Sequence, residues 1–370
     1  MLGTGVFAVW TPAFSLAGSG LLLALGLAAL VAAVNAISTA SLARALPHAG
    51  GVYAYGKEFI GRGAGVAAGY AFVIGKSASA GAAALTIGAY AWPGHERLIG
   101  VLAVAIALAL DLRGIVRSMR VTVVLIVVVV AVIAALAVSW WSTPVSGTVV
   151  EAASPTVWGV LGAAGLLFIA FAGYARITVL GEEVTDPQRT IPRAMVGSFA
   201  VVIVVYAVIE LVVLSAVQSG VVLTPAPLES IAIASDTDGL AVAVRVGAIL
   251  AAGAVLLSLI AGIGRTLFAM GRGGDAPRPL IALNGVQVPW RAEIVAALLT
   301  LAVVAVGGIG FALGLSASTI LTYYGIAHVS MLARWRRGAV RLQMAALAGL
   351  GLIGCVVVVI AIAAVVVIGG

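Results

Sequence analysis

The sequence predicts an all-α polytopic membrane protein of about eleven transmembrane helices. Of its 370 residues, 63% are hydrophobic and only 9% are charged. A soluble domain of this length needs far more charge to cover its surface, so the composition excludes that class. The apolar runs have the length that membrane-crossing helices require, about 20 residues, and they lack the ten-residue alternation of membrane strands.

The apolar runs, separated by turn residues or charges, define the expected spans in chain order. They cover residues 2–17, 19–43, 63–92, 98–112, 121–141, 156–181, 193–217, 240–270, 292–307, 309–333 and 343–369. The first is short, and the fourth is marginal in length unless its ends are partly buried in protein.

The basic residues fall almost entirely on one side of this arrangement. Of the 20 Lys and Arg residues, 17 lie in one set of alternate loops, Arg97 and Arg245 lie in the other, and Lys76 lies within a span. Because cytoplasmic loops carry the excess of positive charge, the first set is expected to be cytoplasmic, with the N-terminus inside. The net charge of +7 therefore favours membrane orientation over nucleic-acid binding.

The usage of cysteine, arginine and lysine bears on disulfides, on metal binding and on the source of the protein. The single cysteine, Cys355, excludes an intrachain disulfide and a cysteine metal cluster. Arginine far outnumbers lysine, and Ala, Val and Gly are abundant, which indicates a GC-rich bacterial genome and hence a bacterial cell membrane.

Two of the expected spans are interrupted by small residues. Residues 3–5 (Gly-Thr-Gly) break the first span, and residues 170–173 (Ala-Phe-Ala-Gly) break the sixth, five helices later. Glycine lets the backbone leave helical geometry, and a broken helix frees N–H and C=O groups at membrane depth. Paired interruptions in two halves indicate a transporter of inverted repeats with its ligand site at the breaks. The alternative is that these glycines serve only close helix packing.

Four stretches carry a longer pattern: "GTGVF", "ALPHAGGVYAYGKEFIG", "FIAFAGYARITVLGEEVTDPQRTIPRA" and "RTLFAMGRGGDAPRPL". Together they resemble the amino acid–polyamine–organocation superfamily, which includes bacterial amino acid permeases of the leucine-transporter-like fold. The resemblance runs over essentially the whole chain, and the third stretch is its most specific part. It implies five helices plus an inverted five, with repeat one at 1–142, repeat two at 155–335 and a peripheral C-terminal helix at 342–370.

The resemblance also implies how a substrate is held. Backbone N–H groups of residues 3–5 would bind the substrate carboxylate, and the carbonyls of residues 170–172 would accept from its α-ammonium. This is chemically sound, because a half-helix N-terminus carries partial positive charge and exposed carbonyls carry the opposite. The candidate substrate-binding residues are Gly3, Thr4, Gly5, Ile169, Ala170, Phe171, Ala172 and Gly173.

The sequence departs from the family pattern in three places. Only Met1 and Leu2 precede Gly3, where the family has an apolar half-helix, and one helix follows the tenth where members commonly have two. Either the start and end of the gene are misplaced, or a member shortened at both ends is expected. Members often carry an aromatic gate near position 169, where Ile169 either admits a bulkier substrate side chain or simply packs in the core.

Lys76 of the third span and Glu210 of the seventh are ionisable residues placed well inside their spans. A charge inside the bilayer costs about 2.5–3.5 kcal/mol on insertion scales, so each is a candidate functional residue. Lys76 is expected to couple transport to protons, since a desolvated lysine can release its proton within a transport cycle. The alternative is that Lys76 pairs with Glu210 or with backbone carbonyls. For Glu210 a structural role is favoured over coupling.

The sequence therefore predicts a secondary active transporter of an amino acid or related amine, proton-coupled or exchanging. Its partners would be that substrate, protons and the lipid bilayer, with no cofactor and no nucleic acid. An enzyme is not expected, because the sequence has no His/Glu/Asp cluster, nucleophile elbow or Walker loop. The alternative from another class is a truncated, non-transporting paralogue that acts as a membrane sensor or subunit.

Overall fold

The computed structural model describes residues 3–46, 50–114, 119–142, 154–174 and 187–368, and every regular element within these ranges is helical. The long helices are α3 (Leu21–Ala45), α5 (Arg62–Ala91), α7 (Met119–Ser142), α10 (Pro187–Gln218), α12 (Leu240–Arg272), α14 (Ile309–Arg336) and α15 (Leu342–Ile368). The shorter helices are α1 (Gly5–Ala8), α2 (Trp10–Ala17), α4 (Gly51–Phe59), α6 (Glu96–Leu112), α8 (Val157–Phe171), α11 (Pro227–Ala234) and α13 (Trp290–Val306). Short 3-10 turns are η1 (Gly18–Gly20), η2 (Ala172–Tyr174) and η4 (Arg278–Ile281).

The prediction of an all-α polytopic membrane protein is confirmed. Each of the eleven predicted apolar runs coincides with one or more helices, and seven helical stretches are long and apolar enough to cross a membrane. The polar loop of residues 175–186, and with it the end of the predicted sixth span, lies outside the described residues. The helices α4 and α11 lie between predicted spans and were not expected.

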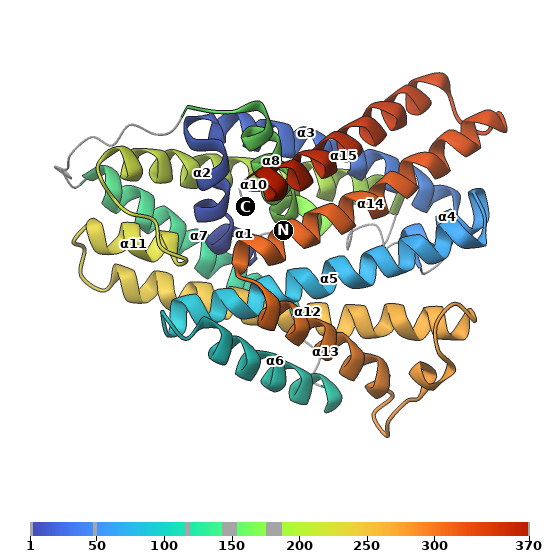
Figure 1. Ribbon diagram of the computed structural model, residues 1–370, viewed down its shortest axis with the longest axis horizontal. Helices are drawn as coiled ribbons and strands as arrows, with labels where there is room; N and C mark the ends of the chain where they lie inside the picture. The colour runs from blue at the N-terminus through green and yellow to red at the C-terminus, as the bar shows by residue number, and fades with distance from the viewer. Residues whose placement is uncertain (1–2, 47–49, 115–118, 143–153, 175–186, 369–370) are drawn as a thin grey trace.

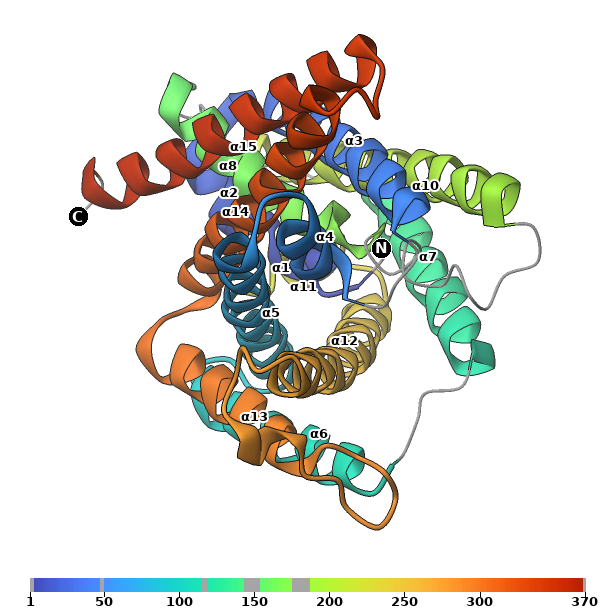
Figure 2. The same cartoon turned by 90° about the vertical axis from the view of Figure 1, so that its right-hand side faces the viewer.

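The helices form a bundle whose middle is occupied by short elements. In Figure 1, α5 and α12 run side by side between an edge formed by α6 and α13 and an opposite edge formed by α3, α8 and α15. Figure 2 shows α1 and α11 near the middle, with α3, α5, α12 and α14 around them. Helix α1 is therefore surrounded by long helices.

Small residues on α5 allow close packing against α13 and α14. A Cβ added at Gly75 would lie 2.5 Å from Thr319 Oγ1 on α14, and one at Gly81 would lie 2.7 Å from Val303 Cγ1 on α13. Without a hydrophobic effect between helices in lipid, such close backbone approach supplies much of the association energy. Large apolar side chains on outer faces, such as Leu30, Val124 and Leu350, are exposed and suit contact with lipid.

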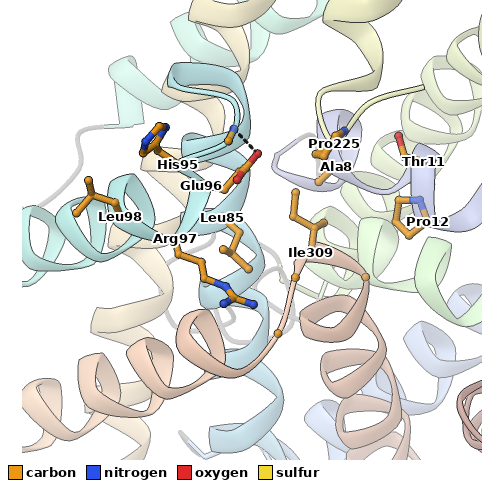
Figure 3. Close-up of a pocket in the computed structure, with 14 residues that line it drawn as sticks. Ala8, Thr11, Pro12, Leu85, His95, Glu96, Arg97, Leu98, Pro225 and Ile309 are labelled. Carbon is orange, nitrogen blue, oxygen red and sulfur yellow. Dashed lines mark hydrogen bonds between the residues drawn. The ribbon is translucent and has the colours of Figure 1, made fainter. Parts of the chain in front are cut away.

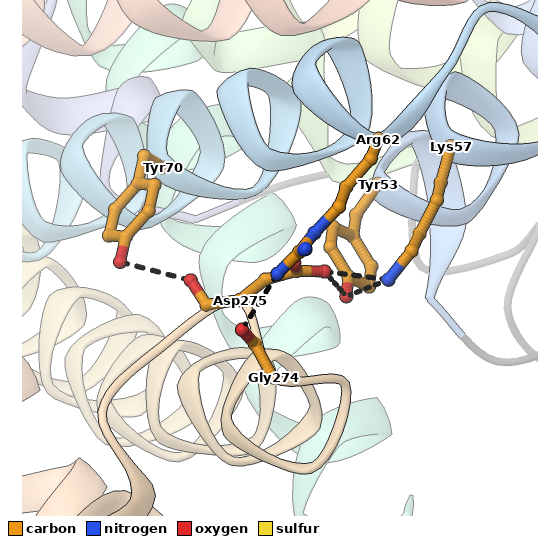
Figure 4. A network of polar contacts seen from close by, with 6 residues as sticks. All are labelled: Tyr53, Lys57, Arg62, Tyr70, Gly274 and Asp275. Carbon is orange, nitrogen blue, oxygen red and sulfur yellow. Dashed lines mark hydrogen bonds and ion pairs between the residues drawn. The ribbon is translucent and has the colours of Figure 1, made fainter.

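A polar network joins α4 and α5 to the segment that follows α12, with Asp275 at its centre (Figure 4). Lys57 Nζ and Tyr53 Oη donate to Asp275 Oδ2 at 2.7 and 2.6 Å, and Arg62 Nε donates to Oδ1 at 2.7 Å. Tyr70 Oη donates to the Asp275 backbone carbonyl at 3.2 Å. The network thus links α4 and α5 to the end of α12, which is distant from them in the chain.

The same network fixes the charge of Asp275. Hydrogen bonds from Lys57, Tyr53 and Arg62 hold the pKa of the Asp275 carboxyl well below its usual range, although its side chain is fully buried. A carboxyl whose pKa is lowered by folding stabilises the protein above its unfolded pKa of about 4, and this stabilisation is lost as the pH falls further. The network is therefore complete at neutral pH and weakens only in acid.

We expect Asp275→Asn to lower the melting temperature of the detergent-solubilised protein by about 2–4 °C at pH 7, a modest effect because Lys57 and Arg62 are partly exposed. The difference from the wild type should shrink as the pH falls below about 4, because the unfolded chain then takes up a proton that the folded Asp275 carboxyl resists, and the network stabilises the fold less. Asp238→Asn is the matched control, because Asp238 is exposed in the segment before α12. Equal melting temperatures of Asp275→Asn and wild type at pH 7 would contradict this role.

Candidate functional site

The first predicted break lies at the start of α1. The helix begins at Gly5, and its first turn is closed by Val6 N–H to the Gly3 carbonyl at 3.1 Å and Phe7 N–H to the Thr4 carbonyl at 3.0 Å. The N–H groups that precede such a turn have no partner within the helix. The Thr4 side chain is buried, and its hydroxyl has no hydrogen-bond partner among the described residues.

The turn from α1 into α2 is irregular, and side chains bind its carbonyls. Pro12 has no N–H, so it cannot bond the Ala8 carbonyl one turn earlier. Trp10 Nε1 donates to the Val6 carbonyl at 2.7 Å, and Tyr90 Oη on α5 donates to the Phe7 carbonyl at 3.0 Å. These bonds hold the short helix in place at the centre of the bundle.

The second predicted break lies at the end of α8. This helix begins with a cap, in which Thr156 Oγ1 accepts from Gly159 N–H at 3.0 Å, and keeps α-helical geometry to Phe171. It then tightens into the 3-10 turn η2 of residues 172–174. The carbonyls at such a helix end need partners from outside the helix.

The two breaks lie against each other. A Cβ added at Gly5 would lie 2.8 Å from Ala170 Cβ and 2.9 Å from Ala170 Cα, and one at Gly3 would meet Val255 Cγ2 on α12 at 2.7 Å. The absence of a side chain at these glycines thus lets the start of α1 approach α8 and α12. The start of α1 and the end of α8 therefore meet in the interior of the bundle.

A cavity of about 740 Å³ lies at one end of the bundle, and its lining includes Ala8 of α1 but none of the eight candidate substrate-binding residues. Figure 3 shows the α5–α6 connection, with Glu96 accepting from Gly94 N–H at 2.9 Å, on one side of it and α2 with Thr11 on another. The lining residues are Ala8, Thr11, Pro12, Leu85, Gly94, His95, Glu96, Arg97, Leu98, Pro225, Gly307, Gly308, Ile309 and Gly310. Since Ala8 belongs to α1, the cavity reaches the helix that starts at the first break.

The sequence pattern described as "Amino acid permease" matches residues 1–370. The chain belongs to the amino acid permease family. Uncharacterized transporters of Mycobacterium tuberculosis (strain H37Rv) and Mycobacterium bovis are each 40% identical to it over 366 residues, which is 98% of this chain and 83% of each relative. The branched-chain amino acid permease BcaP of Lactococcus lactis subsp. cremoris is 24% identical over 320 residues, which is 76% of this chain and 68% of that permease.

In this member of the family, the candidate residues of the second break differ in their surroundings. Phe171 is fully buried and stacks on Phe199 of α10, with ring centroids 6.1 Å apart. Ala170 and Ala172 are also buried, whereas Ile169 and Gly173 are partly exposed. Ile169 packs against the main core. The structure thus brings Gly5 and Ala170 together, and the roles of all eight residues in binding stay a prediction.

One residue at the junction was missed by sequence reasoning. Tyr206 on α10 is fully buried, and its hydroxyl donates to the Ala170 carbonyl at 3.1 Å. The same oxygen lies 3.5 Å from the position of a Cβ on Gly5. The only sequence signal was a tyrosine within the aliphatic run "VVIVVYAVIELVV".

The two candidate coupling residues lie on different helices. Lys76 is half-buried on α5, with its Nζ 5.8 Å from the centroid of the Phe72 ring one turn earlier. Glu210 is fully buried on α10, one turn after Tyr206, which places both on the same face of that helix. Neither carboxylate oxygen of Glu210 has a hydrogen-bond partner among the described residues. The Glu210 oxygens therefore accept no hydrogen bond from Lys76, and the roles of both residues stay a prediction.

Proposed function

We propose that this protein is a secondary active transporter that moves an amino acid or a related amine across the cell membrane, with its N-terminus in the cytoplasm. The observation that carries the proposal is the contact between the two helix breaks, in which Gly5 abuts Ala170. In many transporter folds the backbone groups of two broken helices form the substrate site near the middle of the membrane. Family membership favours transport over the alternative of a non-transporting sensor or subunit.

The proposed pose follows from backbone polarity. The substrate carboxylate binds the N–H groups of residues 3–5 at the start of α1, where the helix end carries partial positive charge. The buried Thr4 hydroxyl supplies a further donor. The α-ammonium binds the carbonyls of residues 170–172 at the end of α8. A zwitterion is thereby held without a charged side chain, which avoids the cost of a permanent charge in the bilayer.

The cavity supplies the access route in this proposal. Its lining includes Arg97, one of the two basic residues on the side that the loop charges place outside. Ala8, which also lines the cavity, is close in sequence to the first break. Leu85 of the long helix α5 lines it as well. Substrate would enter from the outer face along α2 and reach the junction of the breaks beside α1.

Uptake into proteoliposomes tests the proposal. The purified protein is reconstituted, and initial uptake of each member of an amino acid panel is measured with and without an imposed proton gradient. Branched-chain amino acids come first in the panel, because BcaP is named as their permease. Saturable uptake or exchange of one amino acid class is expected. A protein that is folded and correctly inserted but moves no member of the panel would contradict the proposal.

Lys76 is proposed to couple this transport to protons. Lys76→Met is expected to reduce gradient-driven uptake at least about tenfold and to leave exchange of the same substrate intact, since removal of one titrating group affects the driven cycle only. The measurement compares the two rates in the same proteoliposomes.

Lys76→Arg separates coupling from a structural role of the positive charge. Arginine keeps its charge at all relevant pH values, so it restores a structural cation but cannot release a proton. Gradient-driven uptake should therefore stay low in Lys76→Arg. Rescue to the wild-type rate would show that the charge of Lys76 matters for structure only.

A further inference from the structure

The hydroxyl of Tyr206 lies where the two helix breaks meet. Its oxygen is 3.1 Å from the Ala170 carbonyl oxygen and 3.5 Å from the place that a Cβ of Gly5 would occupy. The Tyr206 side chain comes from α10, a different helix from the two, α1 and α8, at which the breaks lie. A third helix thus contributes a polar atom to the junction.

The ring that carries this hydroxyl is held by aromatic contacts. Trp10 of α2 packs edge-on against it with centroids 5.9 Å apart, and Phe171 of α8 does so with centroids 5.4 Å apart. Edge-to-face pairs at these separations favour one ring orientation. The Tyr206 oxygen therefore occupies a fixed position relative to both breaks.

The hydrogen bond to the Ala170 carbonyl determines whether the Tyr206 oxygen can still donate or only accept a hydrogen bond. A phenol has one proton to donate, and Tyr206 donates it to the Ala170 carbonyl, so only acceptor capacity remains. A hydroxyl that donates to one group becomes a stronger acceptor for another. An ammonium group offers donors and no acceptor, which matches this remaining capacity.

We propose that Tyr206 is an amine-recognition residue, whose hydroxyl oxygen accepts a hydrogen bond from the substrate ammonium beside the Ala170 carbonyl. The inference rests on the proposed function, because it takes the Ala170 carbonyl as part of the amine site. It assigns selectivity for a protonated amine to a neutral side chain on α10. Substrates without the amine would gain nothing from Tyr206.

The test is Tyr206→Phe, measured with the amino acid that the wild type transports best and with its deaminated carboxylic acid as a competitor of exchange. Apparent affinity for the amino acid should fall about 10- to 100-fold, the range for a hydrogen bond to a charged group. The inhibition constant of the deaminated acid should not change. Equal affinity of Tyr206→Phe and wild type for the amino acid would overturn the inference, and so would an equal loss for both compounds.

Tyr90→Phe is the matched control. Tyr90 is also fully buried and donates its hydroxyl to a backbone carbonyl, that of Phe7, at 3.0 Å. Loss of either hydroxyl should cost similar stability, yet only Tyr206→Phe should discriminate between the amino acid and its deaminated analogue. An amine-selective loss of the same size in Tyr90→Phe would count against Tyr206 as the amine ligand.

A second substitution covers the case in which Tyr206→Phe does not fold. Replacement of Tyr206 by 3-fluorotyrosine keeps the ring and the donated hydrogen bond but weakens the oxygen as an acceptor. A smaller, still amine-selective loss of affinity is expected, and an unchanged affinity would overturn the inference. If the wild type transports no amino acid, the proposed function fails first; if it does and these variants match it, only the role of Tyr206 fails.

Discussion

Gly5→Ala is expected to abolish amino acid uptake in a protein that remains folded. The added Cβ would lie 2.9 Å from Ala170 Cα and 2.8 Å from Ala170 Cβ, which is closer than side-chain carbons approach in proteins. Because one of these atoms is backbone, the clash cannot be relieved by a rotamer change, and α1 must move away from α8. A displacement of about 1 Å at a binding site can cost about 100-fold in rate, so uptake should fall by at least that factor.

The control is a glycine-to-alanine change where space is available. Gly253 and Gly262 lie in the interior of α12, and a Cβ at either would meet nothing within 4 Å. Gly253→Ala and Gly262→Ala should keep wild-type uptake and equal or higher stability, because alanine favours the helix. Initial uptake rates and melting temperatures are compared for all three variants. Gly5→Ala with wild-type uptake would mean that the junction of the breaks is not the transport site.

The fold was predictable to the extent that the bilayer dictates it. In lipid the backbone must satisfy its own hydrogen bonds, so every long apolar run becomes a helix. The short helices α4 and α11 were missed because helices of eight or nine residues are not stable by themselves. They depend on tertiary contacts, such as the hydrogen bond from Val52 N–H of α4 to Tyr323 Oη of α14 at 3.1 Å.

Of the candidate site, only the features set by neighbouring residues in the chain, the helix breaks, were predictable. The breaks are visible because small residues change helix geometry where they stand, as at Gly5 and Ala172. The hydroxyls of Tyr90 and Tyr206 were not predictable, because they bond carbonyls of residues 83 and 36 positions away in the chain. Such pairings follow from how the helices pack, and the periodicity of a single helix does not encode them.

Sequence reasoning favoured a structural role for Glu210, and that role assumed a partner. A buried ionised carboxylate without a partner costs several kcal/mol, so a structural carboxylate is normally hydrogen-bonded. Both Glu210 oxygens lack a partner among the described residues, and the side chain is fully buried. This environment suits a group that is neutral while buried and loses its proton only when water or a cation reaches it. Coupling, the second interpretation of Glu210, therefore gains support.

Glu210→Gln is expected to preserve folding and exchange while reducing gradient-driven uptake at least about tenfold. Glutamine has the shape of the neutral acid and cannot release a proton, so it should substitute for the buried form only. The readout is the ratio of gradient-driven uptake to exchange in the same proteoliposomes. Because Glu210 lies one turn from Tyr206 on α10, proton release there would occur close to the proposed amine site.

Glu229→Gln is the matched control for this substitution. Glu229 is also a buried glutamate, on α11, but it forms an ion pair with Arg245. Its replacement should lower the melting temperature, because a charge partner is lost, and leave the ratio of driven uptake to exchange unchanged. If Lys76 and Glu210 lie on one proton route, Lys76→Met and Glu210→Gln combined should lose no more driven uptake than either alone. A Glu210→Gln protein with the wild-type ratio would instead make Glu210 a packing residue and leave proton coupling to Lys76.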